Sequence, residues 1–178
     1  MQVTEDSVKT IVNMVRDVPD FPEKGVIFKD IAPVLRDPKA FGLLMDLMAD
    51  RLKDLDFNKI AAIESRGFLL GSSLATQLGK GLVLVRKKGK LPWKTVSESY
   101  SLEYGEATLE IQQDAFEAGD KVVIVDDVLA TGGTAAATVK LCERLGAEVV
   151  ATQFMIELDF LKGAEKLSGA PVDSLIHY

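Results

Sequence analysis

Short apolar runs alternate with amphipathic stretches along most of the chain. Runs rich in Val, Ile, Leu and Ala predict buried strands at Lys59–Ile63, Leu82–Arg86, Lys121–Val125 and Glu148–Ile156. The stretches that follow Gly67 and Gly133 predict helices, which end at Gly79 and Gly146. Apolar strands that alternate with helices are typical of the α/β class, in which helices flank a parallel sheet.

The remaining segments carry weaker patterns. Apolar residues at i, i+3, i+4 and i+7 predict a short helix over Val8–Val15, and the Asp-Pro pair at 37–38 is typical of a helix start. The long polar stretch after the second strand predicts a hairpin that turns near Gly105, with strands at about 100–103 and 108–112. The last residues, "SLIHY", predict a short edge strand.

Composition narrows the class of protein. The chain of 178 residues suits one domain, and 47% hydrophobic with 27% charged residues is typical of a globular protein. A net charge of −6 argues against a nucleic-acid partner, because such proteins are usually basic. No apolar run approaches the ~20 residues that cross a bilayer, and no signal peptide is visible. We therefore expect a cytoplasmic protein without a membrane partner.

The single cysteine and the single histidine argue against several chemistries. Cys142 cannot form an internal disulfide, which favours a reducing compartment. Its place in an apolar helical pattern predicts a core residue rather than a nucleophile. His177 is the only histidine, which argues against a His-based triad or a His-rich zinc site.

The segment that follows the third strand is a candidate ligand loop. Asp126 and Asp127 come directly after the strand, and Thr131-Gly132-Gly133-Thr134 opens the next helix. A helix N-terminus offers free N–H groups, glycines permit close approach, and threonine hydroxyls add donors, so this loop suits a phosphate. The two acids would repel that phosphate but suit ribose hydroxyls, bound directly or through Mg²⁺. The alternative is a tight turn with helix-capping acids.

Other candidate residues share the same edge of the predicted sheet. Ligands of parallel sheets bind beyond the carboxyl ends of the strands, which places 64–67, 86–90 and 126–134 on one rim. The basic residues around Arg86 suit an anion there, although a solvated face or a nucleic-acid patch is the alternative.

Several of these segments resemble one family. The string from Val122 to Thr134 resembles the 5-phosphoribosyl-1-pyrophosphate (PRPP) motif of the type I phosphoribosyltransferases. Four more segments resemble the adenine phosphoribosyltransferases, in the same order: "DFPEKGVIFKDIAPVLRDP" (20–38), "ESRGFLLGSSLA" (64–75), "VRKKGKLP" (85–92) and "SYSLEYG" (99–105). The resemblance implies a single phosphoribosyltransferase domain over 1–178, with the type I fold, a small N-terminal hood over about 1–35 and a flexible hairpin lid over about 87–112.

The resemblance also implies an activity. Such enzymes transfer 5-phosphoribosyl from PRPP to N9 of adenine, giving AMP and pyrophosphate in purine salvage, with Mg²⁺ as cofactor and usually as homodimers. Residues implied at the ribose and 5′-phosphate are Asp126, Asp127, Ala130, Thr131, Gly132, Gly133 and Thr134. Residues implied at pyrophosphate are Arg66, Arg86, Lys87 and Lys90. Mg²⁺ is expected mainly through PRPP, with Asp126 and Asp127 as candidate protein ligands.

Two further segments complete the implied site. Glu103 is the implied acid/base for the purine proton, with Glu106 as competitor, and Tyr104 belongs to the lid. Residues implied at adenine are Ile27, Phe28 and Lys29, whereas core packing is preferred for Val26. A non-proline cis peptide bond is implied between Glu64 and Ser65.

Two alternatives stay open from the sequence. The first is a type I enzyme for hypoxanthine, guanine, xanthine or orotate, against which the adenine-type segment at 20–38 argues. The second is a non-catalytic PRPP-sensing regulator similar to the purine repressors. Those regulators carry an extra DNA-binding domain, whereas here about 20 residues precede the adenine-type segment at 20–38 and the sequence pI is about 4.9.

Overall fold

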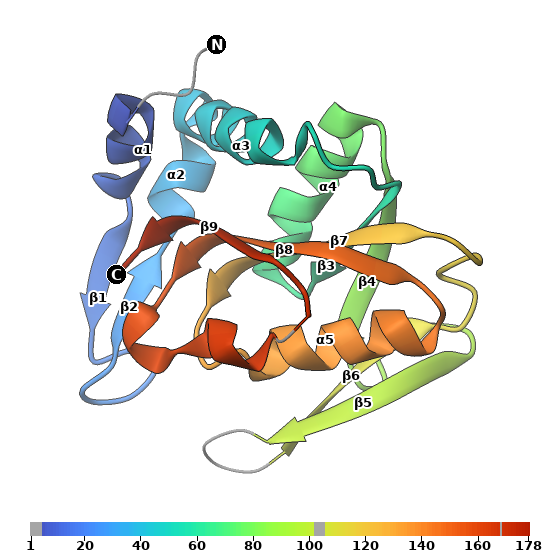
Figure 1. Cartoon of the computed structure of the whole chain (residues 1–178). Helices are drawn as coiled ribbons and strands as arrows, with labels where there is room; N and C mark the ends of the chain where they lie inside the picture. The colour runs from blue at the N-terminus through green and yellow to red at the C-terminus, as the bar shows by residue number, and fades with distance from the viewer. Residues whose placement is uncertain (1–4, 102–105, 168) are drawn as a thin grey trace. The chain divides into compact units, whose positions relative to one another are not determined.

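The computed structural model describes residues 5–101, 106–167 and 169–178 (Figure 1). The chain divides into two compact units, Met1–Lys53 and Asp54–Tyr178. The first unit contains α1 (Glu5–Val12), β1 (Arg16–Pro19), β2 (Ile27–Asp30), α2 (Ala32–Arg36) and α3 (Pro38–Leu52). The predicted helix start at Asp37 is confirmed, because its carboxylate accepts hydrogen bonds from the N–H groups of Lys39 and Ala40, both at 2.9 Å. Such a cap stabilises a helix by about 1 kcal/mol.

The first unit also contains a small antiparallel hairpin that the sequence did not predict. Arg16 pairs with Asp30 and Pro19 with Ile27 in its register. Ion pairs join its two strands, from Arg16 to Asp30 at 2.5 Å and from Lys29 to Asp17 at 2.7 Å. Hairpins this short depend on such cross-strand pairs, because four residues a strand bury little apolar surface.

The second unit is built on a seven-stranded sheet in the order β5-β6-β4-β3-β7-β8-β9. The strands are β3 (Lys59–Ile63), β4 (Gly81–Lys87), β5 (Thr95–Ser101), β6 (Glu106–Gln112), β7 (Lys121–Leu129), β8 (Glu148–Glu157) and β9 (Val172–His177). The helices are α4 (Arg66–Leu78) and α5 (Gly133–Arg144), with short 3₁₀ turns η1 (Asp159–Leu161) and η2 (Gly163–Lys166). Strands β4, β3, β7, β8 and β9 run parallel, and the β5–β6 hairpin adds antiparallel strands at one edge. The predicted α/β class with a mainly parallel sheet is therefore confirmed.

The two helices of this unit cover opposite faces of the sheet. Buried residues of α5 share a core with Ala61 and Ile63 of β3, whose side chains point to one face. On the other face, a Cβ added to Gly71 of α4 would lie 2.5 Å from the Ala62 side chain, so α4 packs closely there. Cys142 of α5 is fully buried in the core, and burial raises its pKa to about 12, so its prediction as a core residue is confirmed.

One strand runs further than predicted. We expected the third strand to end at Val125, but β7 continues to Leu129 and so includes both acids. The extension pairs with β8, with Val128 opposite Ile156 and Leu129 opposite Glu157. The two acids interrupt the apolar run, which is why the sequence pattern stopped early.

The β5–β6 hairpin is fastened to α5. The Lys140 ammonium lies 3.5 Å from the Glu98 carboxylate, and Arg144 also pairs with Glu98. Arg144 donates a second hydrogen bond, of 2.8 Å, to the carbonyl of Ser97.

Among the described residues, no helix is both long and apolar enough to cross a membrane.

Candidate functional site

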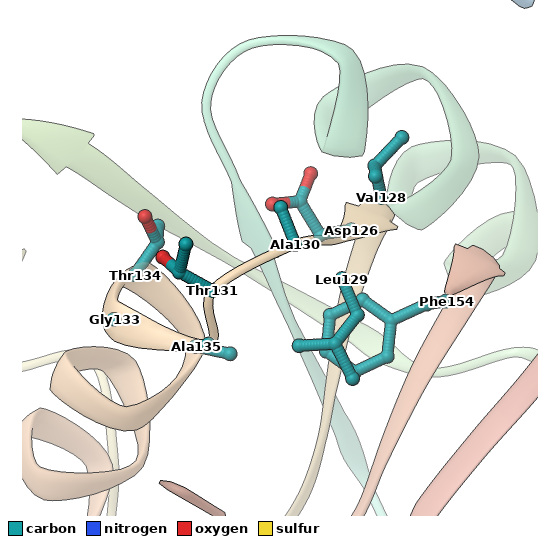
Figure 2. A pocket seen from close by; sticks show the side chains of 10 residues that line it. Asp126, Val128, Leu129, Ala130, Thr131, Gly133, Thr134, Ala135 and Phe154 are labelled. Carbon is teal, nitrogen blue, oxygen red and sulfur yellow. The ribbon is translucent and has the colours of Figure 1, made fainter. Parts of the chain in front are cut away.

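A pocket lies at the carboxyl end of β7, where the chain turns into α5 (Figure 2). Its lining comprises Asp126, Val128, Leu129, Ala130, Thr131, Gly132, Gly133, Thr134, Ala135 and Phe154. The pocket has a volume of about 80 Å³, whereas one water needs about 10–15 Å³. It therefore has room for a group of several atoms, such as a phosphate.

The start of α5 makes this pocket suited to an anion. Gly132 is the N-cap, and no side chain caps the helix there. The first N–H groups of the helix therefore remain available to a ligand, at the positive end of the helix dipole. Figure 2 shows the hydroxyls of Thr131 and Thr134 and the Asp126 carboxylate on the same side of this loop. Thr134 also hydrogen-bonds the Tyr100 hydroxyl at 3.1 Å, which ties the loop to β5.

Gly132 in the loop and Gly163 in η2 allow the loop to pack closely against η2. Gly132 has a φ of 77°, in the left-handed region that favours glycine. A Cβ added to Gly132 would also collide with the carbonyl oxygen of Gly163, and a Cβ on Gly163 would collide with that of Ala130. Sequence reasoning missed Gly163, because its role depends on the close approach of η2 to a loop thirty residues earlier in the chain.

The two acids occupy different environments. Asp126 lines the pocket, whereas Asp127 is 4% exposed and its Oδ2 lies 2.5 Å from the Nε of Arg66. Burial, followed by the charge of Asp127, raises the pKa of Asp126. A Cβ on Gly67 would lie 2.8 Å from Asp126 Oδ1, so the start of α4 packs directly against this carboxylate. The structure therefore brings Arg66 and both acids together, with Asp126 facing the pocket.

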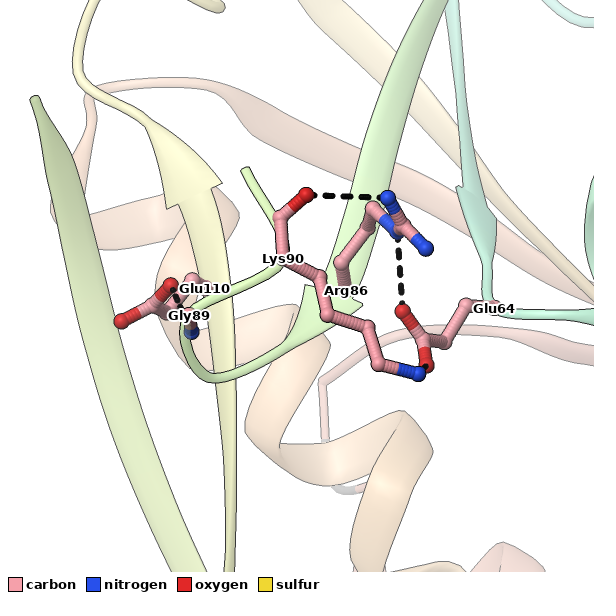
Figure 3. Close-up of polar contacts among 5 residues, drawn as sticks. All are labelled: Glu64, Arg86, Gly89, Lys90 and Glu110. Atoms are coloured by element: carbon pink, nitrogen blue, oxygen red, sulfur yellow. Dashed lines mark hydrogen bonds and ion pairs between the residues drawn. The ribbon is translucent and has the colours of Figure 1, made fainter. Parts of the chain in front are cut away.

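A basic segment (86–90) spans the end of β4 and the turn that follows it. In the sheet, β3 has β4 on one side and β7 on the other. Arg86 and Lys90 both bind the carboxylate of Glu64, which follows β3 (Figure 3). Lys87 is exposed at the end of β4. The expected rim is confirmed, since β3, β4 and β7 are parallel neighbours whose carboxyl ends meet at one edge of the sheet. The expected cis peptide bond is present between Glu64 and Ser65.

Three predicted roles are not tested by the structure. Glu103 and Tyr104 fall outside the described residues, and Glu106 is exposed at the start of β6. The roles predicted for all three stay predictions.

The segment predicted to contact adenine forms β2 of the first unit. Ile27 is 57% exposed, and Phe28 packs edge-on against Phe21 with ring centres 5.2 Å apart. Lys29 binds Asp17 through its side chain, so its ammonium serves the hairpin. The prediction of core packing for Val26 is wrong: this residue, directly before β2, is 38% exposed.

Comparison with known proteins is consistent with this geometry. Residues 32–167 match the phosphoribosyl transferase domain. The adenine phosphoribosyltransferase of Thermosipho melanesiensis is 56% identical over 92% of this chain and 94% of its own.

Solved structures agree with the sequence matches. The crystal structure of adenine phosphoribosyltransferase from Thermoanaerobacter pseudethanolicus superposes with a TM-score of 0.94 at 52% identity, covering 96% of this chain and 99% of that one. The enzyme from Trypanosoma brucei, in complex with AMP, pyrophosphate and ribose-5-phosphate, has a TM-score of 0.88 at 30% identity, covering 99% and 82% of the two chains. The matched domain and these relatives show that the chain belongs to the adenine phosphoribosyltransferases, which are pentosyltransferases of the type I phosphoribosyltransferase family.

Proposed function

We propose that the protein transfers the 5-phosphoribosyl group of PRPP to N9 of adenine, giving AMP and pyrophosphate in purine salvage. The observation that carries this proposal is the pocket at the start of α5, with Asp126 on its wall and Arg66 beside it. The related enzyme from Trypanosoma brucei was solved with AMP, pyrophosphate and ribose-5-phosphate, which are the pieces this reaction handles.

The phosphate loop holds the 5′-phosphate in this proposal. The N–H groups of the loop and the hydroxyls of Thr131 and Thr134 donate hydrogen bonds to the phosphate oxygens. Ala130, Gly132 and Gly133 have small or no side chains, so the backbone can approach the ligand closely. Asp126 accepts hydrogen bonds from the ribose hydroxyls, and Asp127 supports it from the buried side.

The cations on the rim stabilise the leaving group. Displacement at the anomeric carbon gives pyrophosphate more negative charge while the ribose ring becomes oxocarbenium-like, as in glycoside cleavage. In this proposal that charge is neutralised by Arg66, Arg86, Lys87 and Lys90, and cations aimed where charge develops are usually a large part of catalysis.

Adenine is selected by main-chain groups in this proposal. Adenine presents an amino donor beside a ring acceptor, and hypoxanthine reverses this pattern. Carbonyl and N–H groups of Ile27 and Lys29 recognise the adenine pattern, while Phe28 stacks on the base. Rejection follows because the wrong base leaves polar groups unpaired.

Proton transfer is assigned to Glu103. We propose that it takes the N9 proton of the purine as the new bond forms, with Tyr104 in the lid that covers the site. Glu106 is the competing carboxylate for this role.

Magnesium fits the acids at the pocket. Carboxylate oxygens are the ligands that Mg²⁺ prefers, and Asp126 turns its carboxylate to the pocket while Asp127 lies next to it, paired with Arg66. Asp126 and Asp127 are therefore the residues that would hold the ion, with PRPP as its main ligand. When bound, Mg²⁺ supplies charge neutralisation at the pyrophosphate. A cytoplasmic homodimer is proposed on the family resemblance alone.

A base-competition assay tests the proposal. Purified protein is incubated with Mg²⁺ and PRPP plus adenine, hypoxanthine or guanine, and nucleotides are separated by chromatography. We expect AMP from adenine and little product from the other bases. Asp126→Asn serves as the matched variant and should raise the KM for PRPP. Preferential use of hypoxanthine or guanine would overturn the substrate assignment.

A further inference from the structure

Glu64 is a buried carboxylate that the proposed chemistry does not use. It follows β3, and its side chain is only 6% exposed. A carboxylate in such a place is strongly unfavourable unless it is paired and hydrogen-bonded. Its partners therefore indicate why the chain keeps an acid there.

The described partners of its carboxylate all come from the end of β4 and from the turn that follows it. Its Oε2 accepts a hydrogen bond from Arg86 Nε at 2.9 Å, and its Oε1 accepts one from Lys90 Nζ at 2.9 Å (Figure 3). Burial raises the pKa of Glu64, but hydrogen bonds from Lys90, from Arg86 and from the backbone of Lys87 lower it further, so the net shift is downward. Glu64 is therefore an anion at neutral pH, and it binds the side chains of Arg86 and Lys90, which flank Lys87.

The turn is braced at other points as well. Arg86 donates through Nη1 to the carbonyl of Lys90 at 2.9 Å. Gly89, with a φ of 79°, donates its N–H to the buried carboxylate of Glu110 at 2.9 Å. The Arg86 guanidinium also lies 5.9 Å from the centre of the Phe68 ring. Figure 3 shows Glu64 and Glu110 holding the turn from two sides.

This arrangement leaves the cations able to bind a further anion. Within the part of the chain that the structure describes, Arg86 Nη2 has no hydrogen-bond partner. The Lys90 side chain is 51% exposed, so its ammonium can make further hydrogen bonds, and Lys87 is exposed too. Glu64 uses Nε of Arg86 and one N–H of Lys90, and the Lys90 carbonyl uses Nη1 of Arg86, so Arg86 Nη2 and two N–H groups of the Lys90 ammonium remain for a ligand.

We propose that Glu64 is a positioning residue that holds Arg86 and Lys90, on either side of Lys87, in one preformed cradle for pyrophosphate. The inference rests on the proposed function, which assigns pyrophosphate to these cations. Long basic side chains lose rotamer freedom when they bind an anion, and binding strengthens when that freedom is already lost. Because both Glu64 oxygens are engaged by the turn, its charge is partly neutralised before the ligand arrives.

Glu64→Gln tests the cradle, because it keeps the side-chain volume and removes the charge. Pyrophosphate and AMP binding are measured separately by titration calorimetry with Mg²⁺. Losing one charge-assisted hydrogen bond corresponds to about tenfold weaker binding, so we expect the Kd of pyrophosphate to rise about tenfold. The Kd of AMP should change by less than about twofold, because AMP touches the phosphate loop and not the cradle.

Two further variants separate positioning from general damage. Glu64→Asp keeps the charge but withdraws it by one methylene, so the Kd of pyrophosphate should rise by only about threefold. If Glu64→Gln does not fold, this variant takes its place in the test. Asp120→Asn removes another buried acid, one that binds Lys59 at 2.7 Å at the opposite end of β3. It should lower the melting temperature and leave both ligand affinities unchanged.

The outcomes are distinguishable. Pyrophosphate binding that is unchanged or tighter in Glu64→Gln overturns the positioning role, as does equal weakening of pyrophosphate and AMP. Wild-type protein that binds pyrophosphate but forms no AMP from adenine and PRPP contradicts the proposed function instead.

Discussion

Gly163→Ala is the sharpest probe of the phosphate loop. The φ of Gly163 lies outside the left-handed region, so alanine can adopt its backbone conformation and any effect must be steric. The added Cβ would collide with the Ala130 carbonyl oxygen and would lie 3.0 Å from the Gly132 nitrogen. Both atoms belong to the loop that lines the pocket, so the loop has to move away from η2.

The size of the effect follows from this geometry. Relieving the collision needs a shift of roughly an ångström, and a misplacement of about 1 Å at a binding site costs on the order of 10²-fold in rate. Overpacking of this kind also destabilises the fold by about 1–3 kcal/mol. We expect the KM for PRPP to rise between about tenfold and 10²-fold, with a smaller fall in kcat.

Steady-state kinetics and thermal melting measure the two effects separately. Gly42→Ala is the matched control, because a Cβ there meets no atom within 4 Å and the residue is exposed in α3. It should stabilise the helix by about 0.5–1 kcal/mol and leave the KM unchanged. If Gly163→Ala melts at lower temperature yet binds PRPP as the wild type does, η2 does not position the loop.

Two further predictions concern the acids Glu103 and Asp120. Glu103→Gln should lower kcat by about 10²–10⁴-fold while PRPP affinity changes little, because it removes a proton acceptor and not a ligand contact; equal losses in single-turnover rate and PRPP binding would point to positioning instead. The hydrogen bond from Lys59, with others from Glu117 and Asn58, lowers the pKa of Asp120 to about 2. Its stabilising effect is therefore fully present above the unfolded pKa of about 4 and is lost as the pH falls from about 4 to about 2. Acid unfolding followed by circular dichroism should show this loss in the wild type and a smaller one in Asp120→Asn.

Much of the sheet could be predicted from the sequence, because parallel strands buried on both faces are apolar throughout. The run at Lys59–Ile63 matches β3 residue for residue. The β7 extension could not be predicted, because Asp127 is an acid that becomes tolerable in the interior only when Arg66, sixty residues earlier, lies beside it. Such long-range neutralisation leaves no local pattern.

The part of the candidate site that lies within one sequence motif could be predicted. The loop at 130–134 combines residue types whose backbone requirements can be read locally, and the structure places them around one pocket. The hairpin β1–β2 was missed because its strands are short and charged, and only their register shows that Arg16 meets Asp30. The contacts of Glu64 with Arg86 and Lys90 were also missed, because these partners lie more than twenty residues away in the chain.

The hydrogen bond between Thr134 and Tyr100 has a consequence for how the site accepts an anion. Thr134 has one hydroxyl proton, which it can donate either to Tyr100 or to a phosphate. When an anion takes that proton, the tyrosine can rotate its own O–H toward Thr134, so that the bond persists with donor and acceptor exchanged. The β5–β6 hairpin can thus keep this bond to α5 whether or not the pocket is filled, and Tyr100 keeps the Thr134 side chain in place at the pocket.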